Sequence, residues 1–202
     1  MKTTIILEPL VLAAALTATQ VGAAPISLQG STITGTYNDS ADGMLGLDHL
    51  FEAVPGSNTT AIDPDDQLFN NEFLTGDYRF AFDFTTTGQL VVTLNLDPAD
   101  LPAGDYRMRF DFGTSLSQRI GSFTLLDTSG IGSLPALSVV NDHTIAIDLS
   151  SVTWNSEYSQ FSTQIGAATA AVPEPGSIGL ALAGMAGLAL TRRRSGTPGA
   201  QR

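Results

Sequence analysis

The sequence has 202 residues, of which 20 are acidic and nine are basic, so its formal net charge at pH 7 is −11. It contains no cysteine, which excludes disulfide bonds, thiol catalysis and cysteine-ligated metal sites. The negative charge argues against a nucleic-acid partner and against an anionic membrane surface.

The N-terminus has the features of a secretory signal peptide. Lys2 supplies a positive start, and residues 3–16 are mostly apolar, although Glu8 and Pro9 interrupt them. The sequence Val21-Gly22-Ala23 offers small residues where a signal peptidase reads them. We therefore predict that residues 1–23 are a signal peptide, cleaved after Ala23.

Residues 24–171 form the predicted folded domain, and its length suits one domain with a substantial core. This segment holds 18 acidic residues, four arginines and no lysine, which gives it a formal charge of −14. Such a surface keeps a protein soluble and attracts divalent cations.

The hydrophobic pattern of this domain has the period of two that is typical of half-buried strands. It is clearest over residues 77–84, where we expect one face to point inward (Tyr78, Phe80, Phe82 and Phe84) and the other outward (Asp77, Arg79, Ala81 and Asp83). In two further strands the residues predicted to face the core are Leu90, Val92, Leu94, Leu96, Tyr106, Met108, Phe110 and Phe112.

Further strands complete an all-β prediction. Their expected ranges are 27–37, 89–97, 105–112, 119–126, 137–140, 144–149 and 161–165. Short strands separated by Gly- and Pro-rich turns indicate an antiparallel β-sandwich or jelly roll. We expect one helix, near residues 44–53, where apolar residues are crowded together.

One nine-residue stretch occurs twice. Residues 76–84 match residues 104–112 at seven of nine positions, each copy starting with Gly-Asp-Tyr-Arg and ending with Phe-Asp-Phe. Two copies are too few for a solenoid or propeller. We interpret them as equivalent strands of a sandwich; if they were neighbours in a sheet, Arg79 and Arg107 could pair with aspartates across it. A duplicated ligand-binding edge is the alternative.

No catalytic motif is visible in the domain. His49 and His143 are the only histidines, and neither has a metal-ligand spacing, so we expect both to be structural. A pair of carboxylates for glycoside hydrolysis could be drawn from the 18 acidic residues. Trp154 and Tyr158 could stack on a sugar ring, although a single Trp near a strand usually packs in the core or at its rim.

Calcium is the candidate cofactor, and otherwise none is expected. Asp63, Asp65 and Asp66 lie in a four-residue span that Pro64 stiffens, so their oxygens could bind Ca²⁺. Residues 38–43 have the oxygen side chains and the Gly of a calcium loop, but the required twelfth-position Glu is replaced by His49. The alternative for both stretches is turns in which Asp and Asn bind their own backbone.

The C-terminal segment has three parts in a fixed order. Pro173-Glu174-Pro175 comes first, an uncharged run from Ile178 to Leu190 follows, and Arg192, Arg193 and Arg194 stand near the end. The prolines favour an extended peptide. The apolar run is short for a transmembrane helix, which needs about 20 residues. By the positive-inside rule the arginines would stay in the cytoplasm.

This tail, residues 172–202, resembles a PEP-CTERM sorting signal, and the resemblance is confined to it. The resemblance implies an exported protein of a Gram-negative bacterium that is processed by an exosortase. It implies a transient inner-membrane intermediate held by the apolar segment, then release to the cell surface or extracellular matrix. The alternative reading of the tail is an ordinary short membrane anchor.

Two functional classes follow. The first is a non-catalytic surface or matrix protein, adhesive or associated with exopolysaccharide. The second is a small secreted jelly-roll hydrolase that cleaves polysaccharide through a carboxylate pair near Tyr106 or Trp154. The first is favoured because no catalytic motif is visible, and a hollow holding two close carboxylates beside an exposed aromatic ring would favour the second.

Overall fold

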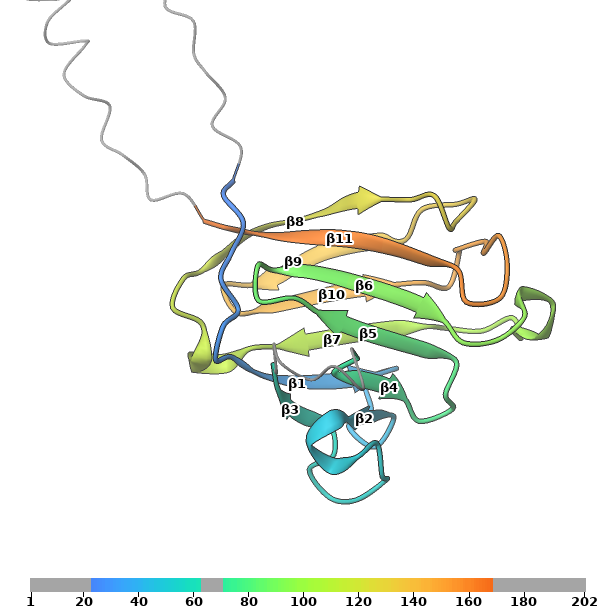
Figure 1. Cartoon of the computed structure of the whole chain (residues 1–202), viewed down its shortest axis with the longest axis horizontal. Helices are drawn as coiled ribbons and strands as arrows, with labels where there is room; N and C mark the ends of the chain where they lie inside the picture. Colours follow the sequence, from blue (N-terminus) through green and yellow to red (C-terminus); the bar gives the residue numbers. More distant parts are fainter. Residues whose placement is uncertain (1–22, 63–70, 169–202) are drawn as a thin grey trace, which may run out of the picture.

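The computed structural model describes residues 23–62 and 71–168, which fold into two antiparallel β-sheets packed face to face (Figure 1). One sheet has five strands in the order β3-β1-β7-β10-β9, namely Thr59–Ala61, Thr32–Tyr37, Arg107–Asp111, Thr144–Asp148 and Ala136–Asn141. The other has six strands in the order β2-β4-β5-β6-β11-β8, namely Met44–Gly46, Phe73–Thr75, Phe80–Phe84, Gln89–Leu94, Gln160–Ala167 and Ile120–Asp127.

The predicted all-β sandwich is therefore confirmed. Within the described ranges the only helical segments are short 3-10 turns, at Leu47–His49, Pro98–Asp100 and Gly113–Ser115. None of the helices in the described part of the chain is long and apolar enough to cross a membrane. Residues 1–22 of the predicted signal peptide and the predicted C-terminal helix lie outside the described residues, and Ala23 is the first residue that the structure describes.

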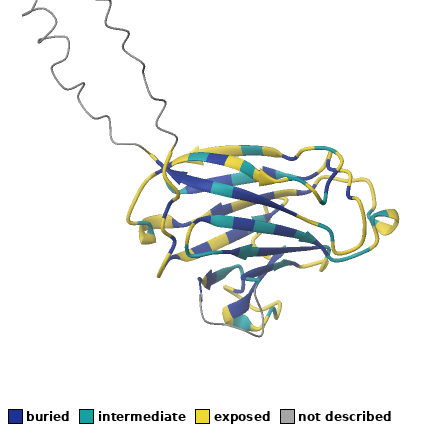
Figure 2. Ribbon diagram, turned by 45° about the horizontal axis from the view of Figure 1, so that its top comes forward, coloured by how far each residue is buried: buried dark blue, intermediate teal, exposed yellow. Residues whose placement is uncertain are grey.

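The core fills the space between the sheets with alternate residues of the strands. In Figure 2 the dark blue of buried residues follows the strands of both sheets, whereas the loops are mostly yellow. The residues predicted to face inward from β6 and β7 are buried, apart from Leu96, which is half-buried. Phe73, Phe80, Phe82, Phe84, Phe110, Phe112 and Phe161 are all fully buried. Aromatic packing therefore dominates the contact between the sheets.

The two copies of the repeated stretch lie in different sheets. β5 belongs to the first copy and sits in the six-stranded sheet, whereas β7 belongs to the second and sits in the five-stranded sheet. They face each other across the core, and their phenylalanines interlock: Phe84 lies 5.0 Å from Phe110 and 5.8 Å from Phe112 between ring centroids. The copies are thus equivalent strands of a sandwich, as predicted, but not neighbours within one sheet.

Each copy instead pairs its own charges. Arg79 bonds to Asp77 at 2.8 Å, and Arg107 approaches Asp105 at 3.4 Å. Both pairs join residues that are two apart in the sequence. The pairs are partly or largely exposed, so they add little to stability.

The predicted helix over residues 44–53 is wrong. Its first three residues form β2, which pairs with β4, and only Leu47–His49 make a 3-10 turn. Gly46 allows this path, because a Cβ there would stand 2.6 Å from the Ser57 carbonyl oxygen. Leu50 and Phe51 then adopt positive φ angles, which end the turn. Long-range pairing therefore overrides the local crowding of apolar residues.

The predicted inward direction of Tyr78 is also wrong. Tyr78 has a φ of 58° and is exposed, whereas its counterpart Tyr106 is buried. A turn holds it there: the Tyr78 N–H donates to the Thr75 carbonyl at 2.7 Å, and the Thr75 hydroxyl donates to Asp77 at 2.6 Å. The strand consequently starts at Phe80. Ala81, predicted to face outward, is buried on the outer side of its sheet.

Candidate ligand-binding face of the five-stranded sheet

Four neighbouring strands align a row of side chains across the outer face of the five-stranded sheet. Thr36 on β1 pairs with Arg109 on β7, Arg109 pairs with Ala146 on β10, and Ala146 pairs with Ser138 on β9. Inner-facing residues such as Phe110 alternate with this row, which fixes its outward direction. The row thus presents hydroxyl and guanidinium groups together with the small side chain of Ala146.

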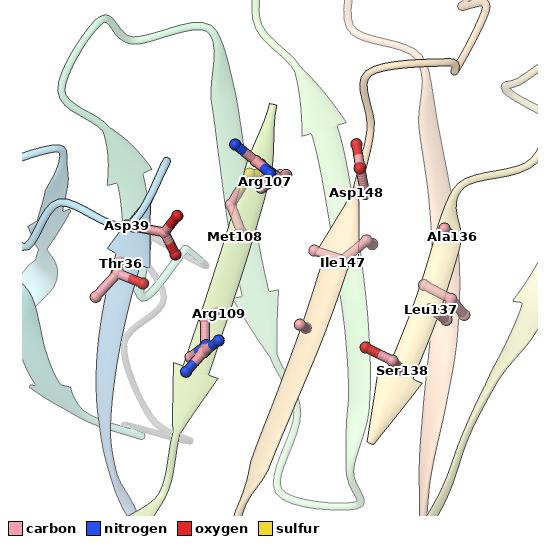
Figure 3. Close-up of a pocket in the computed structure, with 11 residues that line it drawn as sticks. Thr36, Asp39, Arg107, Met108, Arg109, Ala136, Leu137, Ser138, Ile147 and Asp148 are labelled. Atoms are coloured by element: carbon pink, nitrogen blue, oxygen red, sulfur yellow. The ribbon is translucent and has the colours of Figure 1, made fainter. Parts of the chain in front are cut away.

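A hollow of about 390 Å³ lies on this face. Its floor is made by small residues, because Ala136, Ser138 and Ala146 leave space between longer neighbours. Polar groups surround the floor, with Thr36, Asp39, Arg107, Arg109 and Asp148 in the lining (Figure 3). The hollow can therefore offer hydrogen-bond donors and acceptors to one ligand.

The β1–β2 turn fixes the upper part of the hollow. Asn38 and Asp39 both have positive φ, and Tyr37 and Ser40 exchange backbone hydrogen bonds of 3.0 Å, which is the geometry of a type I′ hairpin turn. The Asn38 side chain accepts from the Arg107 N–H at 2.9 Å and donates to the Asp105 carbonyl at 2.8 Å. This clamp holds the turn, with Asp39, beside the start of β7.

Arg107 stands between two carboxylates. Asp39 lies on the turn beside it, and Asp148 is its cross-strand partner on β10 (Figure 3). Asp148 Oδ1 accepts from the Ser150 N–H at 2.9 Å, and the Ser150 hydroxyl accepts from the Tyr106 N–H at 2.9 Å. These bonds fix the Asp148 carboxylate while leaving its second oxygen for a ligand.

Arg109 differs from the other arginines of the domain. It is exposed, and within the described ranges it makes no ion pair and no side-chain hydrogen bond. Arg79, Arg107 and Arg119 each pair with an aspartate. A guanidinium carries five N–H donors in a planar fork, so Arg109 can bind two oxygens of a ligand at once.

Groups with shifted pKa values lie away from this hollow. Burial, with the neighbouring Asp77 carboxylate, raises the pKa of Tyr37, whose hydroxyl donates to Asp77 at 3.1 Å. Burial also raises the pKa of Asp83, on the outer face of the other sheet. Hydrogen bonds from Ser129 lower the pKa of Asp127. Each shift has a local structural cause.

A second hollow, of about 360 Å³, lies at Tyr106 and Trp154. Among the described residues that line it none is acidic; it is built mainly from prolines and aliphatic side chains. Trp154 packs into the core, 6.0 Å from Phe80 and 5.7 Å from Phe161 between ring centroids. Tyr158 is exposed and does not line this hollow. The aromatic residues and carboxylates predicted for a hydrolase are therefore not brought together here.

The structure does not test the main calcium prediction. Asp63, Asp65 and Asp66 lie outside the described residues. The other candidate loop, residues 38–43, is the hairpin turn described above, and the Asn38 oxygen is occupied by the Arg107 N–H. Across residues 23–62 and 71–168, no group of three or more His, Asp or Glu side chains is arranged to hold a metal ion, so His49 and His143 are not part of one.

Sequence reasoning missed the polar row and its hollow. The outward positions of β7 were predicted correctly, because Arg107 and Arg109 alternate with buried residues. The alignment of Thr36, Arg109 and Ser138 depends on strand order and register, which join β1 to β7 and β7 to β10 across long stretches of the sequence. A useful signal was present in the short runs of Thr, Ser and Ala at alternate positions of β1, β9 and β10.

Comparison with known proteins identifies the tail. Residues 171–195 match the family model of the PEP-CTERM protein-sorting motif. This match contains both Pro173-Glu174-Pro175 and Arg192–Arg194, although these residues lie outside the described structure. The match covers the tail and not the β-sandwich. Neither a curated protein nor a solved structure matches the chain.

Proposed function

We propose that this chain, which carries a PEP-CTERM sorting motif, is an exported surface or matrix protein whose β-sandwich binds extracellular polysaccharide without cleaving it. The motif implies export and cell-surface sorting by an exosortase in a Gram-negative bacterium. The single observation that carries this assignment is the match at residues 171–195.

The sorting route would use the three parts of the tail in turn. Pro173-Glu174-Pro175 would be held as an extended peptide by the exosortase. The apolar run from Ile178 to Leu190 would hold the precursor in the inner membrane, and Arg192–Arg194 would stop transfer at the cytoplasmic side. Processing would then release the β-sandwich to the surface or matrix.

Polysaccharide binding is supported by the chemistry of the hollow. Sugar rings present many hydroxyl groups, each of which both donates and accepts hydrogen bonds. Arg107 and Arg109 can donate to ring substituents, Asp39 and Asp148 can accept from them, and Thr36 can do either. The open outer face of a sheet leaves room for a long chain to cross several strands.

A non-catalytic role is supported by how the groups are distributed. Among the residues that the structure describes, the hollow with carboxylates has no aromatic residue in its lining, and the hollow with Trp154 has no carboxylate. Glycoside hydrolysis needs two carboxyl groups flanking the scissile bond, one of them protonated. Neither hollow combines such a pair with an aromatic platform.

The hydrolase remains the second candidate because Asp39 and Asp148 both line the larger hollow. Incubation of the domain with host polysaccharide, followed by a reducing-end assay, tests it. The binding proposal predicts no release of reducing ends. Release by the unmodified domain that is lost in both Asp39→Asn and Asp148→Asn would establish the hydrolase instead.

Affinity electrophoresis in gels containing host exopolysaccharide tests the binding proposal. The domain should be retarded, and Arg109→Ala should weaken binding by about 1.5–3 kcal/mol, typical of hydrogen bonds to a charged group. Arg119→Ala is the matched control, because it removes the same charge from an exposed position outside the hollow. An equal loss of affinity in both variants would mean that net charge alone causes the effect. If the unmodified domain is not retarded, polysaccharide binding is refuted.

A further inference from the structure

The edge strands on the two sides of the sandwich differ in how far they are protected from pairing with another chain. β2 and β3 end the two sheets on one side, and β8 and β9 end them on the other (Figure 1). An edge strand exposes unpaired N–H and C=O groups that can pair with another chain. How each edge is protected therefore bears on assembly.

The β2/β3 side is protected. Both strands have only three residues. The Asp48 carboxylate accepts from the Ala61 N–H of β3 at 2.9 Å, and the Asp48 N–H donates to the Thr60 hydroxyl at 3.2 Å. The Gly46 N–H of β2 donates to the Ser57 carbonyl. Short length and local hydrogen bonds thus satisfy this edge and place a charge on it.

β9 lacks the short length and the edge charge of the other side, although its ladder with β10 has one irregularity, which leaves Val140 without a β10 partner. β9 has six residues and pairs with β10 along one side only. Along the other side, its backbone groups have no partner within residues 23–62 and 71–168. Its sequence, Ala-Leu-Ser-Val-Val-Asn, contains no charge and no proline. Residues 136–139, which precede this irregularity, form an edge that is open to strand pairing.

The surroundings of β9 are also uncharged and partly apolar. Residues 128–141 contain no charged side chain, although the domain has 18 acidic residues and four arginines. Leu126 on the adjacent β8 and Leu134 in the loop before β9 are 60% and 59% exposed, and Val140 is 43% exposed. Two copies of a domain with a charge of −14 repel each other. The repulsion is weakest where uncharged surfaces meet, as they would at the β8/β9 side.

We propose that β9 is a self-association edge, through which two copies of this chain pair their β9 strands antiparallel. An antiparallel pair of strands about a two-fold axis is self-complementary, so the same strand of each copy can form the two sides of the interface. The axis would pass near Ser138 and Val139, at the middle of the strand. The two five-stranded sheets would then form one continuous sheet, and the two hollows would share one face. This proposal does not depend on the ligand.

Analytical ultracentrifugation of the exported protein, purified from its host, tests the proposal. We expect a monomer–dimer equilibrium that strengthens with sodium chloride, because salt screens the repulsion between two acidic domains. Val140→Lys should abolish the dimer. This change lowers the net negative charge, so electrostatics alone would favour association. Loss of the dimer would therefore mean that the lysine blocks strand pairing at the β9 edge. Ala61→Lys, on the protected edge, is the matched control and should leave the dimer intact.

Hydrogen exchange of the unmodified protein gives a second readout that does not require a variant to fold. The amides of residues 136–141 should become more protected as protein concentration rises. A monomer at every concentration and salt level would overturn the proposal. So would a dimer lost in Ala61→Lys but kept in Val140→Lys. Protection of β9 that is independent of concentration would also overturn it and would indicate another segment of the same chain as the occupant.

Discussion

Phe82 and Phe110 pack edge to face across the core, with ring centroids 5.1 Å apart and ring planes at 62°. They occupy the same position in the two copies of the repeated stretch. Phe110 also contacts Phe73 and Phe84, at 5.7 Å and 5.0 Å. The repeat therefore builds the centre of the core from both sheets, and it does not build a duplicated surface.

This arrangement predicts a gradient of stability effects. Phe110→Ala should lower the free energy of unfolding by about 3–5 kcal/mol, as for other buried aromatic residues. Phe112→Ala should cost less, because among the described residues Phe112 packs against one aromatic ring and Phe110 against three. Phe82→Asp and Phe110→Asp should unfold residues 24–171 outright, since each buries a charge. Urea denaturation followed by circular dichroism measures all four, and a larger loss in Phe112→Ala would contradict the packing.

A second prediction concerns Asp83, whose pKa burial raises above its ordinary value of 3.8. The protonated form is favoured in the folded state, so its stabilising contribution is present at low pH. That contribution is lost as the pH rises through the ordinary and then the raised pKa. Asp83→Asn should therefore raise the melting temperature at pH 7 and have no effect below the ordinary pKa.

Asp111→Asn is the control for this change. Asp111 holds the equivalent position in the second copy, is exposed, and accepts from the Gly113 N–H at 2.9 Å. Both changes remove one negative charge, so only the half-buried Asp83 site should show the additional gain in melting temperature. Thermal melts of both variants between pH 3 and pH 8 make the comparison, and equal gains would mean that net charge alone is responsible.

Local patterns predicted the strands well and the turns poorly. β6 and β7 alternate buried residues with more exposed ones, so their core positions could be read from the sequence. β5 departs from this alternation at Ala81, which is buried although an outward position was predicted, and Leu96, beyond the end of β6, is half-buried. Tyr78 was misplaced because the hydrogen bonds of a turn outweigh the alternation. β2, β3 and β4 were missed because each has three residues, too few to show a period. The hollow around Arg109 was missed because register joins distant segments.

A third prediction concerns calcium. If Asp63, Asp65 and Asp66 bind Ca²⁺, calcium should raise the melting temperature of residues 24–171, because a ligand of the folded state stabilises by about 2.7 kcal/mol at one hundred times its dissociation constant. Sodium chloride of matched ionic strength is the control, since screening alone stabilises an acidic domain. The excess over that control should vanish in Asp65→Ala/Asp66→Ala. Equal effects of calcium and matched salt would make this cluster a solvated turn.

The sorting assignment makes the most direct prediction about the role of the protein. Alanine replacement of Pro173-Glu174-Pro175 should remove the segment that we propose the exosortase binds. Neutral replacement of Arg192–Arg194 should remove the cytoplasmic stop. Each variant should therefore be retained or misrouted while the β-sandwich still folds, because none of its described strands contains these residues.

The decisive measurement is the mass and cellular location of both tail variants and the unmodified protein, expressed in the native host. The account predicts that the unmodified protein reaches the surface or medium with a shortened C-terminus. The variants should remain as unprocessed precursor in the inner-membrane fraction. Identical processing and location of all three proteins would contradict sorting by this tail.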